Sequence, residues 1–157
     1  MAELKWNGDK LFQKIVDTTL KRMDSLGNQM VKDIKSSMKP GTGRLYKSRT
    51  GVGMHRASKP YYPPAPDTKN LKDSIDYNVW ISGYEIILRV GSKLKDKYPI
   101  YLEIGTSKML PRPFIRPCLE RFRPKIVAII GKTGGIRVFP IAEDSSGLGF
   151  GEGSLTS

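Results

Sequence analysis

Apolar side chains recur at three- and four-residue steps between residues 9 and 38, which predicts one long amphipathic helix. The apolar positions are Leu11, Ile15 or Val16, Leu20, Met23, Met30 or Val31, Ile34 and Met38. Asp9 is the candidate N-cap, Pro40 marks the end, and Gly27 is a position where the helix is expected to bend or break. An unbroken helix of this length spans about 45 Å. We therefore expect part of its apolar stripe to pack on another subunit.

Two stretches further along alternate between apolar and polar positions, as strands with one buried face do. They cover residues 76–83 and 84–92 and meet at a turn around Gly83. The positions on the apolar face are Tyr77, Val79, Ile81, Ile86, Leu88 and Val90. The pattern predicts an antiparallel hairpin that lies on a helix. A short helical turn is expected just before it, over residues 71–75.

Residues 39–70 have almost no periodic pattern and contain Gly, Pro, Ser and Thr throughout. A loop of this length is uncommon inside a compact domain unless it is functional or disordered. We expect a mobile loop that becomes ordered on binding.

The chain from residue 98 onward predicts two further helices. The first is short and carries Pro99 in its first turn. Pro111, Pro113 and Pro117 then exclude regular helix over residues 110–117. A second helix is expected to follow and to run to about residue 130, because apolar side chains from Phe114 onward recur every four residues, although Pro117 and Pro124 weaken the pattern. A hairpin over residues 125–141 is the alternative; we favour the helix, followed by a strand near 136–141.

These elements predict an α+β fold, in which a long N-terminal helix and a second helix pack on a small antiparallel sheet. Residues 1–141 form the predicted domain, with the mobile basic loop at 39–70. Residues 142–157 are rich in Gly and Ser, carry three acids and no base, and are predicted to be a flexible tail. No apolar run is long enough to span a membrane, and the first ten residues have no apolar signal region. We expect no membrane partner.

The formal net charge of the chain is +12, and the excess is unevenly distributed. Residues 39–59 contain six basic side chains and no acid, which favours contact with a polyanion or an acidic protein surface. Tyrosines interleave with these bases, as on surfaces that stack nucleic-acid bases. The candidate contact residues are Arg44, Lys47, Arg49, His55, Arg56 and Lys59.

Catalytic chemistry has little support in the sequence. The single histidine, His55, and the single cysteine, Cys118, have no partners at the spacing of a metal site or a catalytic pair. The motif Gly-Lys-Thr at 131–133 matches only the end of a phosphate-binding loop, because Ile126 stands where that loop needs its first glycine. We predict a protein that is not an enzyme, with no catalytic residue, cofactor or metal.

Residues 98–117, YPIYLEIGTSKMLPRPFIRP, are expected to have an architectural role. Glu103 is expected to accept hydrogen bonds from the backbone of residues 105–107 or to pair with Arg112. Gly105 permits a turn that a side chain would obstruct, and Phe114 is expected to fill the core. The residues expected to anchor the short helix on the sheet are Tyr98, Tyr101, Leu102 and Ile104.

Two blocks of the chain resemble one protein family. They are GRLYKS followed by MHRASKPYYPPAPDTKNLKDSI, and YLEIGTSKMLPRPFIRPCLE, so the match runs from Gly43 to about Glu120. The chain resembles the tail-component and head–tail joining proteins of long-tailed double-stranded DNA bacteriophages. The pair Lys69-Asn70 stands where the family usually has Thr-Gly. The matching signature residues are Tyr98, Tyr101, Leu102, Glu103, Gly105, Thr106, Arg112, Pro113, Phe114 and Pro117.

The resemblance implies a structural virion protein of the head–tail neck, made in the host bacterial cytoplasm, and not an enzyme. It implies self-association into a ring, hexameric or dodecameric, through which DNA passes. The implied partners are the neighbouring connector or stopper ring and the tail terminator, with non-specific contact to DNA in the lumen. The implied fold is α+β. The alternative function, from charge alone, is non-sequence-specific nucleic-acid binding.

Overall fold

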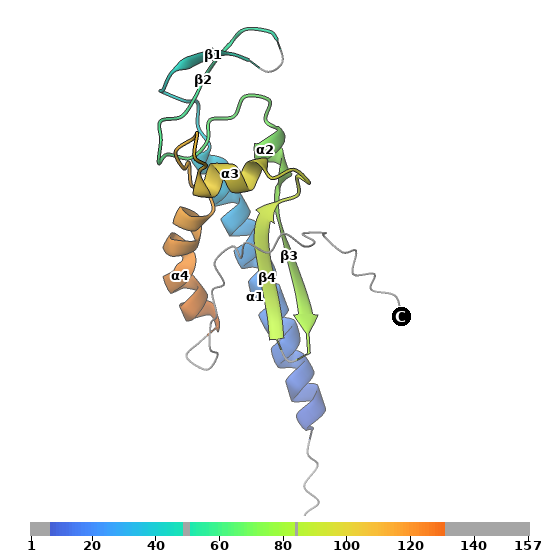
Figure 1. Ribbon diagram of the computed structural model, residues 1–157. Helices are drawn as coiled ribbons and strands as arrows, with labels where there is room; N and C mark the ends of the chain where they lie inside the picture. Colours follow the sequence, from blue (N-terminus) through green and yellow to red (C-terminus); the bar gives the residue numbers. More distant parts are fainter. Residues whose placement is uncertain (1–6, 49–50, 84, 131–157) are drawn as a thin grey trace, which may run out of the picture.

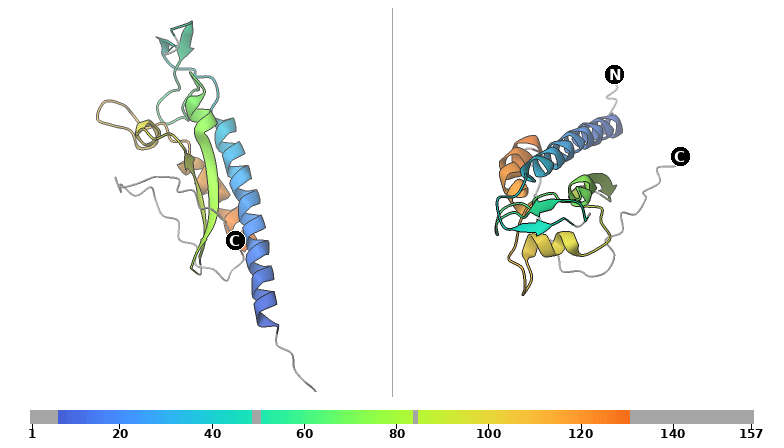
Figure 2. Two further views of the ribbon diagram at one scale, coloured as in Figure 1. Left: turned by 90° about the vertical axis from the view of Figure 1, so that its right-hand side faces the viewer. Right: turned by 90° about the horizontal axis from the view of Figure 1, so that it is seen from above.

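A 30-residue helix, α1 (Gly8–Ser37), forms the long axis of the molecule, and the other elements pack along its C-terminal part (Figure 1). The computed structural model describes residues 7–48, 51–83 and 85–130. Strands β3 (Ile75–Ser82) and β4 (Glu85–Ser92) lie along α1 (Figure 2), and α4 (Arg116–Ile130) also packs on it. The fold is α+β, as the sequence predicts.

The start of α1 differs from its prediction. Asn7, not Asp9, is the N-cap, and it makes no side-chain capping bond. The helix also runs unbroken through Gly27, which is buried. A side chain at Gly27 would overlap the ring of Tyr77, since its Cβ would lie 2.3 Å from a ring carbon. Gly27 is therefore a site of close helix–strand approach and not a break.

Strands β3 and β4 form the predicted antiparallel hairpin, with Val79 opposite Leu88 and Tyr77 opposite Val90. The Tyr77 hydroxyl donates a 2.7 Å hydrogen bond to Asp24 Oδ1 and accepts one of 2.6 Å from Asn28 Nδ2. The bond to Asp24 is the main reason that the pKa of Tyr77 is raised. The short helix α2 (Asn70–Ser74) precedes β3, close to the predicted helical turn.

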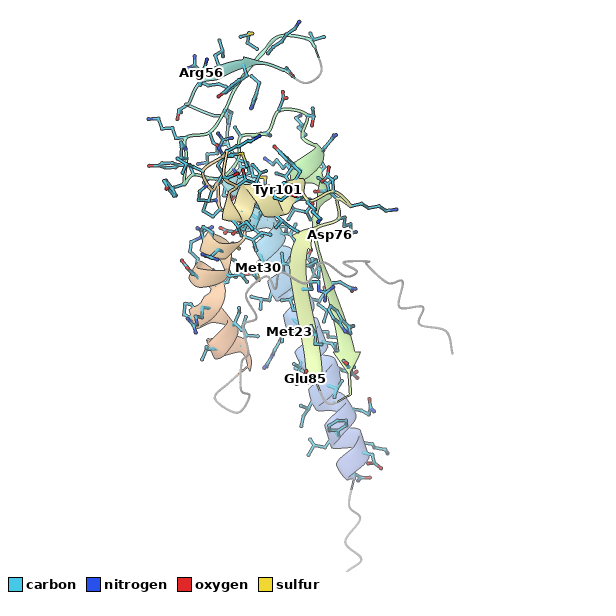
Figure 3. All side chains as sticks on the ribbon, in the orientation of Figure 1. Met23, Met30, Arg56, Asp76, Glu85 and Tyr101 are labelled. Carbon is cyan, nitrogen blue, oxygen red and sulfur yellow. The ribbon has the colours of Figure 1, made fainter. Side chains whose placement is uncertain are left out.

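The core lies between α1, the sheet and α4. Met23 and Met30 project from α1 into it (Figure 3). Its buried members are Met23, Leu26, Met30, Ile34, Met38, Ile75, Leu102, Phe114, Cys118 and Phe122. Arg121 of α4 pairs with Asp33 of α1 at the edge of this core. Phe114 and Cys118 are fully buried, which confirms the predicted core role of Phe114.

The predicted second helix is confirmed by α4, which begins at Arg116. The exclusion of regular helix up to residue 117 is wrong at its end, because Pro117 lies in the first turn of α4, where proline is tolerated. The hairpin alternative is wrong for residues 125–130. Pro124 lies inside the helix, where its ring removes one backbone hydrogen bond. Burial of Cys118 and Phe122 on one face of α4 outweighs that loss. The predicted strand at 136–141 and the predicted tail at 142–157 lie outside the described residues.

The prediction of an irregular loop over residues 39–70 missed a second hairpin. Strands β1 (Leu45–Lys47) and β2 (Met54–Arg56) pair antiparallel, with Tyr46 opposite His55. This hairpin projects from one end of the molecule (Figure 1). Its three-residue strands are too short for the periodicity on which the sequence prediction depended.

None of the described helices is apolar enough over a sufficient length to cross a membrane.

Candidate functional site: a basic hairpin arm and its base

The projecting hairpin, which we call the hairpin arm (residues 43–57), carries most of the predicted contact residues. Arg44, Lys47 and Arg56 are exposed on it, and His55 is partly buried. Figure 3 labels Arg56 on the projecting hairpin. Lys59 follows the arm and is exposed, while Arg49 lies outside the described residues. The structure thus gathers four of the six predicted residues on one projection and a fifth beside it.

Apolar and aromatic side chains accompany these bases. Arg44 stacks over the ring of Tyr46, with its guanidinium carbon 5.7 Å from the ring centroid. Val52, at the tip, is 82% exposed and lies between two glycines with positive φ. The large apolar or aromatic side chains exposed on or beside the arm are Leu45, Tyr46, Val52, Met54, Tyr61 and Tyr62. A projection that is both apolar and cationic is suited to an acidic protein surface or to a nucleic acid.

An acidic residue outside the arm contacts it on the side of its turn. Asp67 Oδ1 accepts a 2.6 Å hydrogen bond from the Ser48 hydroxyl and lies 4.0 Å from His55 Nδ1. Arg56 bonds within the arm, through Nη1 to the carbonyl oxygen of Gly43 at 3.2 Å. These contacts leave Arg44 and Lys47 as exposed cations of the arm.

The chain after the arm is attached to the second signature block. The Tyr61 amide donates a 2.8 Å hydrogen bond to the carbonyl of Pro111. Tyr61 has φ 65, a left-handed conformation that is uncommon without glycine. Gly41 fits closely under residues 56–57, because a Cβ there would lie 2.0 Å from the carbonyl oxygen of Arg56. Both signature blocks therefore meet at the base of the arm.

Glu103, on α3 (Tyr98–Ile104), organises the second signature block. Its carboxylate is 5% exposed and accepts three backbone hydrogen bonds, from the amides of Phe114 (2.9 Å), Ile115 (3.1 Å) and Arg116 (2.8 Å). It therefore caps the start of α4. Neither expected partner is correct, because these bonds go to neither residues 105–107 nor Arg112. A negative charge is favourable at a helix N-terminus, where several amides have no partner within the helix.

Gly105 ends α3 with φ 81, which confirms its predicted role at a turn. A Cβ there would lie 2.9 Å from the carbonyl oxygen of Met109. The following residues form a tight turn, in which the Thr106 amide donates to Met109 O at 2.8 Å. The Arg112 amide then donates to Leu102 O at 2.6 Å, which returns the chain to α3.

The predicted anchors of α3 are only partly correct. Leu102 is buried, but Tyr98, Tyr101 and Ile104 are 43%, 44% and 50% exposed. Pro99 is buried in their place. The buried face of α3 is formed by Pro99, Leu102 and Glu103, which are spaced three and four residues apart, and Tyr98, Tyr101 and Ile104 lie off that face. The Arg112 guanidinium Nε is buried without a hydrogen-bond partner among the described residues.

Among the described residues, no three His, Cys, Asp or Glu side chains come together as they would at a metal site. Cys118 is fully buried, and burial is the main reason that its pKa is raised to about 12, so it is not a nucleophile in the folded chain.

Comparisons of the chain with family models, curated proteins and solved structures gave no match. The function of the chain is therefore inferred from its residues and from where the structure places them.

Proposed function

We propose that this chain is a structural virion protein of a tailed bacteriophage, which forms a ring at the head–tail neck and joins the two assemblies. The observation that carries the proposal is the meeting of the two signature blocks at one end of the molecule. There the second block supports the base of the hairpin arm through the bond between Tyr61 and Pro111. The segments that resemble the joining family thus form one unit, and the exposed part of this unit is the cationic hairpin arm.

The arm suits a contact between rings. A partner ring with an acidic rim would attract Arg44 and Lys47 before close contact and would cover Val52 and Met54 afterwards. DNA in the lumen would be held by the same cations without reading of sequence. The long axis along α1 holds the arm away from the opposite end of the molecule, so the arm can contact a neighbouring ring while other surfaces remain available within its own ring (Figure 1).

The experiment that tests this proposal measures association with cognate neck and tail assemblies by light scattering. The wild-type chain is expected to bind these assemblies, and Arg44→Glu with Lys47→Glu to bind at least tenfold less. Lys95→Glu with Lys97→Glu changes the net charge equally at exposed positions away from the arm, and is the matched control. Equal binding by both double variants would contradict a joining role for the arm.

Non-sequence-specific nucleic-acid binding is a second candidate function. It is favoured by the Arg44–Tyr46 stack and by the exposed Tyr61 and Tyr62. A gel shift on unrelated DNA duplexes across a salt series separates the two functions. If DNA binding is the main activity, affinity is high at moderate salt and falls steeply with salt. The joining role instead predicts weak DNA binding together with tight binding to the protein rings.

A further inference from the structure

The N-terminal part of α1 presents an apolar face at the end of the molecule opposite the hairpin arm (Figure 1). Leu11, Phe12 and Ile15 are 57%, 57% and 55% exposed, whereas Met23 and the apolar residues after it on α1 contribute to the core. A shallow, open depression, which we call the groove, lies along this face. Its lining residues are Leu11, Lys14, Ile15, Thr18, Thr19 and Arg22.

The groove continues to the C-terminal end of α4. A second depression is lined by Arg22, Ser25, Ala128 and Ile129, and so shares Arg22 with the first. Arg22 Nη1 also donates a 3.3 Å hydrogen bond to the carbonyl oxygen of Ile129. The chain therefore leaves α4, at Ile130, directly beside the groove.

The charges around the groove restrict what can occupy it. Lys14 and Arg22 line it, and Lys10 and Lys21 lie on the same edge of the helix as Lys14, four residues before it and seven after it. Asp17 lies on this edge between Lys14 and Lys21, so the edge keeps a net positive charge. Pairing with α1 of a second copy would bring these cations together, which is unfavourable. The occupant needs apolar side chains and acids, with few bases.

Residues 142–157, AEDSSGLGFGEGSLTS, have this composition. They contain three acids and no base, and their larger apolar side chains are Leu148, Phe150 and Leu155. The eleven residues 131–141 span at most about 36 Å when extended. The groove runs back from Arg22 to Leu11, a distance of about 16 Å along the helix. Residues 142–157 can therefore reach the groove of their own chain.

We propose that residues 142–157 bind the α1 groove of the same chain. Their acids pair with the Lys10–Lys14–Lys21 edge, and their apolar side chains cover Leu11 and Ile15. Binding within one chain has a high effective concentration, which offsets the cost of ordering a Gly-rich segment. This inference does not depend on the proposed function, since it concerns the isolated chain.

Paramagnetic broadening tests the proposal in the full-length chain. A spin label attached to Asp17→Cys, an exposed position on the lysine edge that is not a proposed binding residue, is expected to remove amide NMR signals from residues 142–157. A label on Lys95→Cys is expected to leave them. Cys118 does not compete for the label, because it is fully buried with a pKa raised to about 12. Undiminished signals with the Asp17 label would overturn the proposal.

A mixed sample distinguishes binding of residues 142–157 within one chain from binding by a second copy. The spin-labelled chain is mixed with an isotope-labelled chain that carries no spin label, and the signals of residues 142–157 are expected to stay at full intensity. Broadening in this mixture would mean that another copy occupies the groove, which would also overturn the proposal. In the spin-labelled full-length chain, adding Ile15→Asp should restore the lost signals, whereas Gln13→Asp, at an exposed position on another face of α1, should not.

Discussion

Glu103 joins two segments that lie eleven to thirteen residues apart, because its two oxygens hold the first amides of α4. Removing a capping side chain costs about 0.5–2 kcal/mol, and buried amides left without partners cost more. We expect Glu103→Ala to lower the free energy of unfolding by about 2–4 kcal/mol. Urea denaturation measures this loss.

Two control variants make the Glu103 prediction specific. Glu103→Gln keeps an acceptor oxygen of similar reach and should lose less stability than Glu103→Ala. Glu120→Ala removes an exposed acid from α4 and should change stability by less than about 0.5 kcal/mol. Equal stability of Glu103→Ala and the wild-type chain would show that the cap is not structural.

Lys69 has φ 63 where it precedes α2, a left-handed conformation that costs a non-glycine residue about 1–2 kcal/mol. Lys69→Gly is therefore expected to raise the free energy of unfolding. The gain is limited to about 1 kcal/mol, because glycine also has more freedom in the unfolded chain, which partly offsets the relief of strain. Lys69→Ala removes the charge but keeps the strained geometry. A gain in thermal stability for Lys69→Ala equal to that for Lys69→Gly would attribute the effect to charge instead.

Residue roles were predictable where they depended on backbone geometry or size. Gly105 and Phe114 have the roles that the sequence predicts. The partners of Glu103 were not predictable, because they depend on how residues 105–113 return the chain to α3. The close packing of Gly27 against Tyr77 depends in the same way on two elements fifty residues apart in sequence.

At the scale of elements, that close packing determines how α1 and β3 fit together. A Cβ on residue 27 would overlap the Tyr77 ring, which also bonds Asp24 and Asn28. Gly27→Ala is therefore expected to destabilise the protein by about 1–3 kcal/mol, although alanine favours helix. Gly8→Ala, at the start of the same helix, is the control for helix propensity. A stabilised Gly27→Ala protein in thermal denaturation would contradict the packing described.

Two ion pairs predict how stability depends on pH. Burial by itself raises the pKa of Asp33, but the hydrogen bond and charge of Arg121 lower it overall, and the hydrogen bond from Lys93 lowers the pKa of Asp76. Stability from such groups is present above the unfolded pKa, about 3.9, and is lost as pH falls through the lower folded value. We expect the urea midpoint to fall with pH below about 4.

Asp33→Asn is expected to reduce that dependence on pH, because its side chain has no proton to gain. Asp17→Asn, at an exposed position of the same helix, should leave the slope of midpoint against pH unchanged. A slope that is the same in the wild type and in Asp33→Asn would show that the pair with Arg121 does not contribute.

Long or strongly alternating elements were predictable, and short ones were not. The patterns of α1, β3 and β4 extend over enough residues to identify each element and most of its buried face. Ile81, predicted on the apolar face of β3, is instead 50% exposed, because it lies near the end of the strand. The three-residue strands of the hairpin arm have no such pattern, and their pairing depends on the glycine turn at the tip. The exposed end of α1 has the same apolar spacing as its buried part, so sequence alone did not separate them.

At the scale of the whole molecule, we propose that the two ends have different tasks. One end carries the cationic hairpin arm, which we propose contacts another ring or DNA. The other presents an apolar helix face that we infer is covered by residues 142–157. The elongated body between them holds these surfaces apart through one core (Figure 2).

The proposed joining role can be tested by electron microscopy of joined particles. DNA-filled heads and finished tails from a cognate phage lacking this chain are mixed with the purified protein, and joined particles are counted. We predict efficient joining by the wild type and by Lys95→Glu with Lys97→Glu, and at least tenfold less by Arg44→Glu with Lys47→Glu. Heads and tails that join equally well without the protein would contradict the proposed role.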